Sequence, residues 1–133
     1  LLNTIKTQKE GLIFANVQEI DLSGHAQDIK RSRRILCIVN EYLPVLIHSL
    51  KSEDLLIITA DHGNDPLIGH PYHTREYVPL FVFNQNINRQ KIKTCDSLSD
   101  IGASISEFYN LDLPENGTSF MQKQITSRLS KVC

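Results

Sequence analysis

The stretch that decides the fold is Leu55-Leu56-Ile57-Ile58-Thr59-Ala60-Asp61-His62-Gly63-Asn64-Asp65-Pro66. Its first five residues are almost wholly apolar and rich in branched side chains, which predicts a strand buried on both faces of a parallel sheet. Asp61 and His62 follow this strand directly. Ligands bind outside the carboxyl ends of strands in open α/β sheets. The stretch therefore predicts an α/β protein with a ligand site at this edge of the sheet.

A long amphipathic helix is predicted before this strand. Apolar residues recur at helical spacing from about Asp28 to Leu50. Pro44 lies inside this pattern and predicts a kink. The pattern also predicts a buried strand at residues 11–17, which is followed by a loop at residues 21–25.

After the strand, a long polar stretch leads to a further strand predicted at residues 78–83. A loop of that length is more often functional than idle. Ser97-Leu98-Ser99-Asp100 predicts a capping box for a helix that ends near Phe108. A tail that opens at Gly117 has room for one more helix. This order of elements predicts an α/β sheet covered by helices.

The composition predicts one domain over residues 1–133, and 41% hydrophobic residues are enough for a core. Fourteen basic and 15 acidic residues give no field of one sign, so neither nucleic acid nor a membrane surface is expected as a partner. The one basic cluster, Lys30-Arg31 with Arg33-Arg34, falls in the helical pattern and is interpreted as a solvated helix face.

Three widely spaced cysteines, Cys37, Cys95 and Cys133, predict neither a disulfide framework nor a zinc knuckle. A reducing cytoplasm is the expected location, since no apolar run approaches the roughly 20 residues that span a bilayer and no signal peptide is visible. The chain begins at Leu1 and its single methionine is Met121, so we expect a fragment.

A carboxylate and a histidine follow each of the first two predicted strands. Asp21 with His25 follows the first predicted strand, Asp61 with His62 follows the second, and His73 lies on the next loop. Mixed imidazole and carboxylate ligands favour manganese, zinc or iron. Two divalent cations about 3.5 to 4 Å apart can clamp a phosphoryl group. Phosphoryl transfer is therefore the first reaction class to test.

Simpler roles are open for several of these residues. Asp21 could simply end a strand, because aspartate is common in turns, and His25 could cap or precede a helix. His70 is either a chelating partner of His73 or an ordinary loop histidine, whereas His48, late in the amphipathic helix, is interpreted as structural. Neither Thr59 nor Thr74 has the helix start or glycine-rich turn that would activate a nucleophile.

Asp61-His62-Gly63-Asn64-Asp65-Pro66, together with His73-Thr74-Arg75-Glu76-Tyr77-Val78-Pro79, resembles the carboxy-terminal part of the phosphopentomutases in the alkaline phosphatase superfamily. The resemblance extends to residues 16–28, to Leu43-Pro44, and to residues 99–103 and 117–120. It implies an alkaline phosphatase-like parallel-sheet core, present only in part and without the cap domain. The chain would then be the carboxy-terminal part of that core.

The resemblance also implies two bound divalent metal ions, manganese first and zinc as the alternative. Asp21, His25 and His73 would hold one ion. Asp61 and His62 would hold the other. The implied activity interconverts ribose 1-phosphate and ribose 5-phosphate through a phosphothreonine. No residue of this chain matches that threonine, so the nucleophile is expected in the amino-terminal half of the same enzyme.

Asp21 and His25 are separated by three residues, one fewer than in the phosphopentomutases and closer to the cofactor-independent phosphoglycerate mutases. A metal-dependent phosphatase, a phosphoglycerate mutase-like enzyme and an inactive metal-binding fragment are the alternatives. Asp65 is predicted to fix the tautomer of a ligand histidine. Arg75 is predicted either to bind phosphate or to pair with Glu76.

Overall fold

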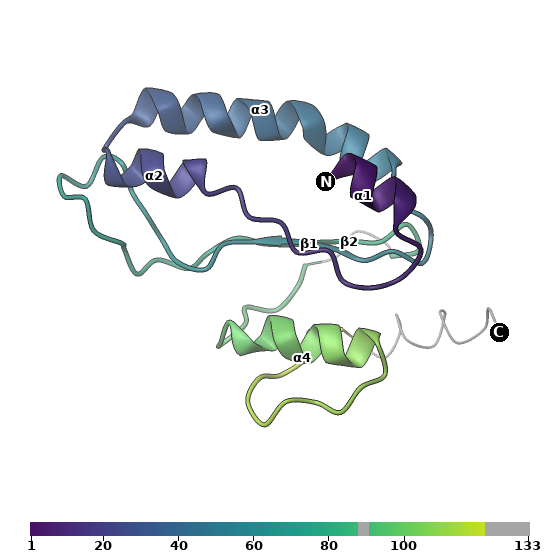
Figure 1. Ribbon diagram of the computed structural model, residues 1–133. Helices are drawn as coiled ribbons and strands as arrows, with labels where there is room; N and C mark the ends of the chain where they lie inside the picture. Colours follow the sequence, from purple (N-terminus) through teal and green to yellow (C-terminus); the bar gives the residue numbers. More distant parts are fainter. Residues whose placement is uncertain (88–90, 122–133) are drawn as a thin grey trace. The chain divides into compact units, whose positions relative to one another are not determined.

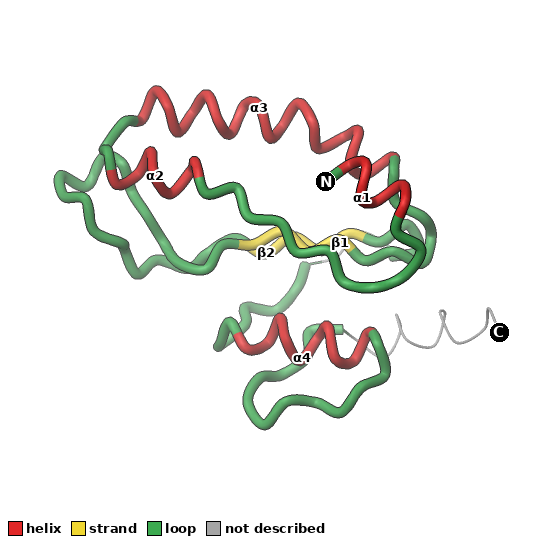
Figure 2. The backbone as a smooth tube through the Cα atoms, viewed as in Figure 1, coloured by secondary structure: helices red, strands yellow, loops and turns green. Residues whose placement is uncertain are grey.

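The computed structural model describes residues 1–87 and 91–121 as a mixed α/β chain (Figures 1 and 2). It divides into two units, Leu1–Val82 and Phe83–Cys133, which are described separately. The elements within the described residues are α1 (Leu2–Thr7), α2 (Glu19–His25), α3 (Ile29–His48), β1 (Leu56–Thr59), β2 (Leu80–Phe83) and α4 (Ser99–Phe108).

In the first unit, α2 and α3 pack against each other. Asp28 caps α3, because its carboxylate accepts a hydrogen bond from the Arg31 backbone N–H at 3.0 Å. The buried hydroxyls of Ser23 on α2 and Ser32 on α3 lie 2.7 Å apart. Arg31 also forms an ion pair with Glu19. These contacts fix the orientation of the short helix α2.

The long helix and the strands near residues 55–60 and 78–83 were predicted correctly in type and position. The helix α3 continues through Pro44 to His48, and β1 and β2 form a two-stranded sheet. An antiparallel bridge between Gly63 and Thr74 closes the loop that joins the strands. However, β1 is only partly buried, because in the described residues it has a single partner strand and not the wider sheet that the sequence predicts. The larger parallel core stays a prediction.

Two local predictions were wrong. Residues 11–17, predicted as a buried strand, form no strand within the described chain, and Phe14 is 89% exposed. A strand needs a neighbour to pair its backbone groups, and no described segment supplies one here. Residues 21–25 are helical and not a loop. Glu19 and Asp21 in the first turn of α2 favour the helix, since acidic side chains complement its dipole.

In the second unit, α4 occupies the predicted position, and the capping box predicted at residues 97–100 is formed in part. The Asp100 carboxylate accepts backbone N–H groups of Asp96 and Ser97, at 3.1 and 3.4 Å. It also accepts the Thr118 N–H at 2.7 Å, while the Ser104 hydroxyl accepts the Phe120 N–H at 3.0 Å. The additional tail helix would lie mostly outside the described residues.

The composition predicted a core, but in the described residues only Ala103 and Met121 are buried hydrophobic side chains. Large apolar side chains such as Leu12 and Phe81, each 64% exposed, face outward. Among the helices described, none combines the length and the apolar character that crossing a bilayer requires.

Candidate metal centre

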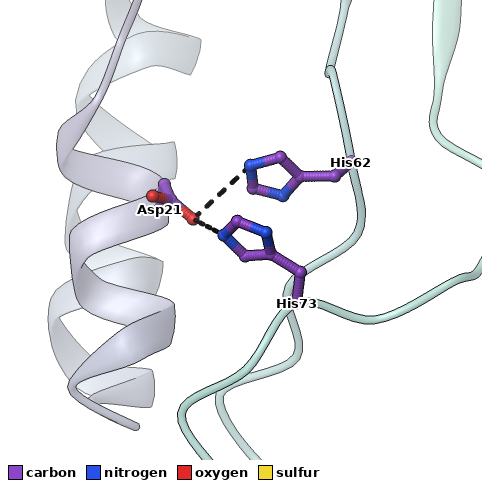
Figure 3. Close-up of side chains that lie close together, drawn as sticks. All are labelled: Asp21, His62 and His73. Atoms are coloured by element: carbon purple, nitrogen blue, oxygen red, sulfur yellow. Dashed lines mark ion pairs between the residues drawn. The ribbon is translucent and has the colours of Figure 1, made fainter.

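Three side chains from two segments of the first unit meet at one point (Figure 3). Asp21, His62 and His73 each offer one ligand atom, and these atoms all lie within 4.8 Å of one another. The Asp21 Oδ1 atom is 3.6 Å from Nε2 of His73 and 4.0 Å from Nε2 of His62. The helix α2 supplies the carboxylate, and the loop between β1 and β2 supplies both imidazoles.

His25 joins this group through α2. Residues four apart lie on one face of a helix, so His25 stands beside Asp21, with its Nε2 3.2 Å from Asp21 Oδ2. The same Nε2 lies 3.1 Å from Nε2 of His73. Two ring nitrogens at that distance require a proton or a cation between them, because their lone pairs repel each other.

The bridge between Gly63 and Thr74 brings the two loop histidines together. The Thr74 N–H donates to the Gly63 carbonyl at 2.9 Å. His62 and His73 immediately precede these residues, and their rings stack with centroids 3.6 Å apart. The loop geometry therefore sets the spacing between the two imidazoles.

Backbone carbonyls orient two of the rings. Nδ1 of His25 lies 2.6 Å from the Pro71 carbonyl, and Nδ1 of His62 lies 3.2 Å from the Gly63 carbonyl. A carbonyl only accepts, so each Nδ1 must donate, which leaves the Nε2 lone pair for a ligand. Such a partner on the far side of the ring is typical of metal-bound histidine.

The electrostatics of the cluster favour an ionised carboxylate. Burial raises the pKa of Asp21, but a hydrogen bond from Asn64 and the nearby His25, His62 and His73 outweigh that effect. The net result is a pKa below the ordinary value of 3.8. Asp21 is thus an ionised carboxylate at neutral pH, as an oxygen ligand to a metal would need to be.

The donor set and its spacing fit a divalent transition metal. Ligand atoms that share one metal at about 2.1 Å lie roughly 3 to 3.5 Å apart. The two Asp21–histidine distances of 3.6 and 4.0 Å are only slightly longer. Imidazole nitrogen with carboxylate oxygen suits zinc, manganese or iron better than magnesium or calcium. Asp21, His62 and His73 therefore form a candidate metal site.

The cluster of Asp21, His62 and His73 combines residues from both of the ligand sets that the sequence resemblance implies. His62 was assigned with Asp61 to one ion, yet its Nε2 also lies near Asp21 and His73. Asp61 is beside His62, with its Oδ1 3.6 Å from Nε2, but its side chain is 87% exposed. The division of these five residues between two ions stays a prediction.

The supporting roles of Asp65 and Arg75 stay predictions. The Asp65 carboxylate accepts the Leu67 N–H at 2.8 Å. Arg75 is exposed, and the described residues give it no ion pair with Glu76, whose carboxylate instead accepts a bond from the Thr74 hydroxyl at 2.7 Å.

The remaining histidines are held locally. Nδ1 of His70 accepts the Tyr72 N–H at 3.3 Å, and Nδ1 of His48 donates to the Pro44 carbonyl at 2.6 Å. Neither belongs to the group of candidate ligands in the described residues.

Sequence reasoning missed Asn64 and the Pro71 carbonyl. The Asn64 amide lies 2.7 Å from Asp21 Oδ1. An amide directly after Asp61-His62-Gly63 was a usable signal, since groups beside metal ligands commonly hold them in place. The Pro71 carbonyl could not be found this way, because every residue carries one.

The chain belongs to the Metalloenzyme superfamily, whose family model matches residues 1–113. This assignment agrees with the convergence of histidine and aspartate side chains in the first unit. Within the superfamily, the chain is similar to a phosphopentomutase from Clostridioides difficile (strain 630). The two are 36% identical over 121 residues, which cover 90% of this chain and 31% of that relative. The chain thus spans about a third of the length of that curated relative.

Proposed function

We propose that the intact protein containing this chain is a phosphopentomutase that interconverts ribose 1-phosphate and ribose 5-phosphate. The observation that carries the proposal is the convergence of Asp21, His62 and His73 within 4.8 Å. The similarity to a phosphopentomutase, at 36% identity over 90% of the chain, supports the choice of substrate.

In this proposal the chain supplies five ligands to two divalent ions, with manganese as the first candidate. Asp21, His25 and His73 hold one ion, and Asp61 and His62 hold the other. The backbone bonds to His25 and His62 support these roles, because they leave each Nε2 free to ligate. Two bound cations would supply charge stabilisation to the attacking and leaving oxygens of the phosphoryl group. The residues of this chain hold and orient those ions.

The rest of the enzyme would supply the phosphorylated threonine and the substrate-binding surface. In the proposed arrangement, the wider alkaline phosphatase-like sheet would include β1 and β2. Exposed apolar side chains such as Phe14, at 89%, and Phe81, at 64%, support additional polypeptide against these faces. An apolar surface of this kind is normally covered in a stable protein.

The test uses the full-length protein with manganese, and it assays both isomerisation of ribose 1-phosphate and metal content. His73→Ala removes a side chain that lies between His25 and His62. We expect it to lose one of two bound ions and to reduce activity by more than about a hundredfold, since losing a ligand costs more than losing its support.

His48→Gln is the control, because His48 is exposed and its bond is to its own helix. It should retain both ions and full activity. Unchanged metal content in His73→Ala would overturn the ligand assignment. Release of inorganic phosphate in place of ribose 5-phosphate would show a phosphatase.

A further inference from the structure

Asn64 contacts Asp21 twice. Its side-chain nitrogen donates to Asp21 Oδ1 at 2.7 Å and to the Asp21 backbone carbonyl at 3.2 Å. Both acceptors lack a hydrogen, so the side-chain nitrogen and not the oxygen must face them. Both N–H groups of the Asn64 amide therefore donate to Asp21.

The contacted oxygen is the one that faces the imidazoles. Asp21 Oδ1 lies 3.6 Å from Nε2 of His73. A carboxylate oxygen has two lone-pair directions, so one can accept from Asn64 while the other points to a metal. Asp21 Oδ2 instead lies 3.2 Å from Nε2 of His25. The Asn64 bond thus fixes the rotation of the Asp21 carboxylate. In this orientation Oδ1 faces His73 and Oδ2 faces His25.

Gly24 leaves space for the side-chain amide of Asn64. The glycine is buried inside α2 and its φ is not positive, so its backbone conformation does not require glycine. Glycine is unfavourable within a helix relative to alanine. A Cβ at position 24 would lie 2.3 Å from Asn64 Oδ1 and 2.6 Å from its nitrogen. Space for the Asn64 side chain is thus the structural reason for glycine at this position.

We propose that Asn64 is a positioning residue that holds Asp21 Oδ1 in its metal-binding orientation, and that Gly24 exists to admit the Asn64 amide. The inference rests on the proposed function of the site. Asn64 couples α2 to the loop after β1 through one side chain. A larger residue at position 24 therefore disturbs metal binding by displacing Asn64.

The test measures Mn²⁺ affinity of the full-length protein by titration calorimetry and the Mn²⁺ environment by electron paramagnetic resonance. Asn64→Ala should weaken Mn²⁺ binding by about 10- to 100-fold, the usual effect of removing a group that supports a ligand. It should also change the resonance spectrum. Gly24→Ala should do the same, because its methyl group takes the space of the amide.

The double variant distinguishes this coupling from two separate defects. Asn64→Ala removes the three atoms that lie nearest to a Cβ at position 24, so Gly24→Ala with Asn64→Ala should bind Mn²⁺ no more weakly than Asn64→Ala alone. Gly102→Ala is the matched control. Gly102 also lies within a helix, α4, and a Cβ there would meet nothing within 4 Å.

Each result decides the inference. Wild-type affinity in Asn64→Ala, or a double variant whose losses multiply, would overturn it while leaving the proposed function intact. A merely structural role would lower the melting temperature without altering the spectrum of the bound ion, and that also contradicts it. If the wild-type protein binds no Mn²⁺, the proposed function fails and the inference with it.

Discussion

Asp21 and Asp100 are both acidic residues in the first turn of a helix, one in each unit, and both have a pKa below the ordinary value. The causes differ. Backbone hydrogen bonds, above all from Thr118, lower the pKa of Asp100 and outweigh its desolvation. For Asp21, desolvation is the largest single effect and raises the pKa. The hydrogen bond from Asn64 and the three nearby histidines together lower the pKa by more than desolvation raises it.

This difference separates a structural carboxylate from a candidate metal ligand. The oxygens of Asp100 accept backbone N–H groups of Asp96, Ser97 and Thr118, and the bond from Thr118 holds the segment that follows Gly117 against α4. The oxygens of Asp21 face four side chains: His25 on the same helix, and His62, His73 and Asn64 on the loop between β1 and β2. All of these except Asn64 are imidazoles. A lowered pKa alone therefore does not identify a site; the chemical nature of the neighbours does.

The largest expected effect comes from removing the charge at Asp21. Asp21→Asn in the full-length protein should weaken metal binding by more than about a hundredfold, because the anionic oxygen ligand is lost. Asp100→Asn should leave the metal content unchanged. Metal analysis of the two purified variants measures this directly, and equal losses in both would remove the distinction between the two carboxylates.

A smaller effect is expected at Gly117, which faces the second unit's own backbone. Its φ is 109°, and a Cβ would lie 2.4 Å from the Ser99 carbonyl oxygen. Gly117→Ala should cost at least about 1–2 kcal/mol of unfolding free energy, since a side chain in this conformation is strained. Thermal melting checks the loss of stability. Mn²⁺ affinity, measured alongside, should not change, and a weakened metal site would contradict the separation of roles.

The smallest effect is a pH dependence at Asp100. Its folded pKa lies below the ordinary value of 3.8, so its bonds stabilise the fold fully above that pH. The contribution is lost as pH falls through the lower, folded pKa. The difference in melting temperature between wild type and Asp100→Asn should be a few degrees and constant from pH 5 to 7. Below about pH 4 it should shrink, and a difference that grows on acidification would reverse the sign of the argument.

Much of the local structure could be predicted from sequence. The helical spacing of apolar residues located α3, and the branched apolar run located β1. The prediction failed at residues 11–17 because a strand depends on a partner segment, and at residues 21–25 because a short helix depends on its packing. Ser23, which joins α2 to α3, has no periodic signature that would reveal this contact.

The sequence by itself determined the chemical types present and their local order: a carboxylate and histidine four apart, an Asp-His-Gly-Asn run after a strand, and a third histidine on the following loop. Only the tertiary structure decided that Asp21 meets His62 and His73, and that Asn64 rests on Gly24. The physical reason is that hydrophobic periodicity and turn chemistry act between near neighbours. Contacts across 43 or 48 residues, such as Asp21 with Asn64 and His25 with His73, depend on how α2 and the loop pack.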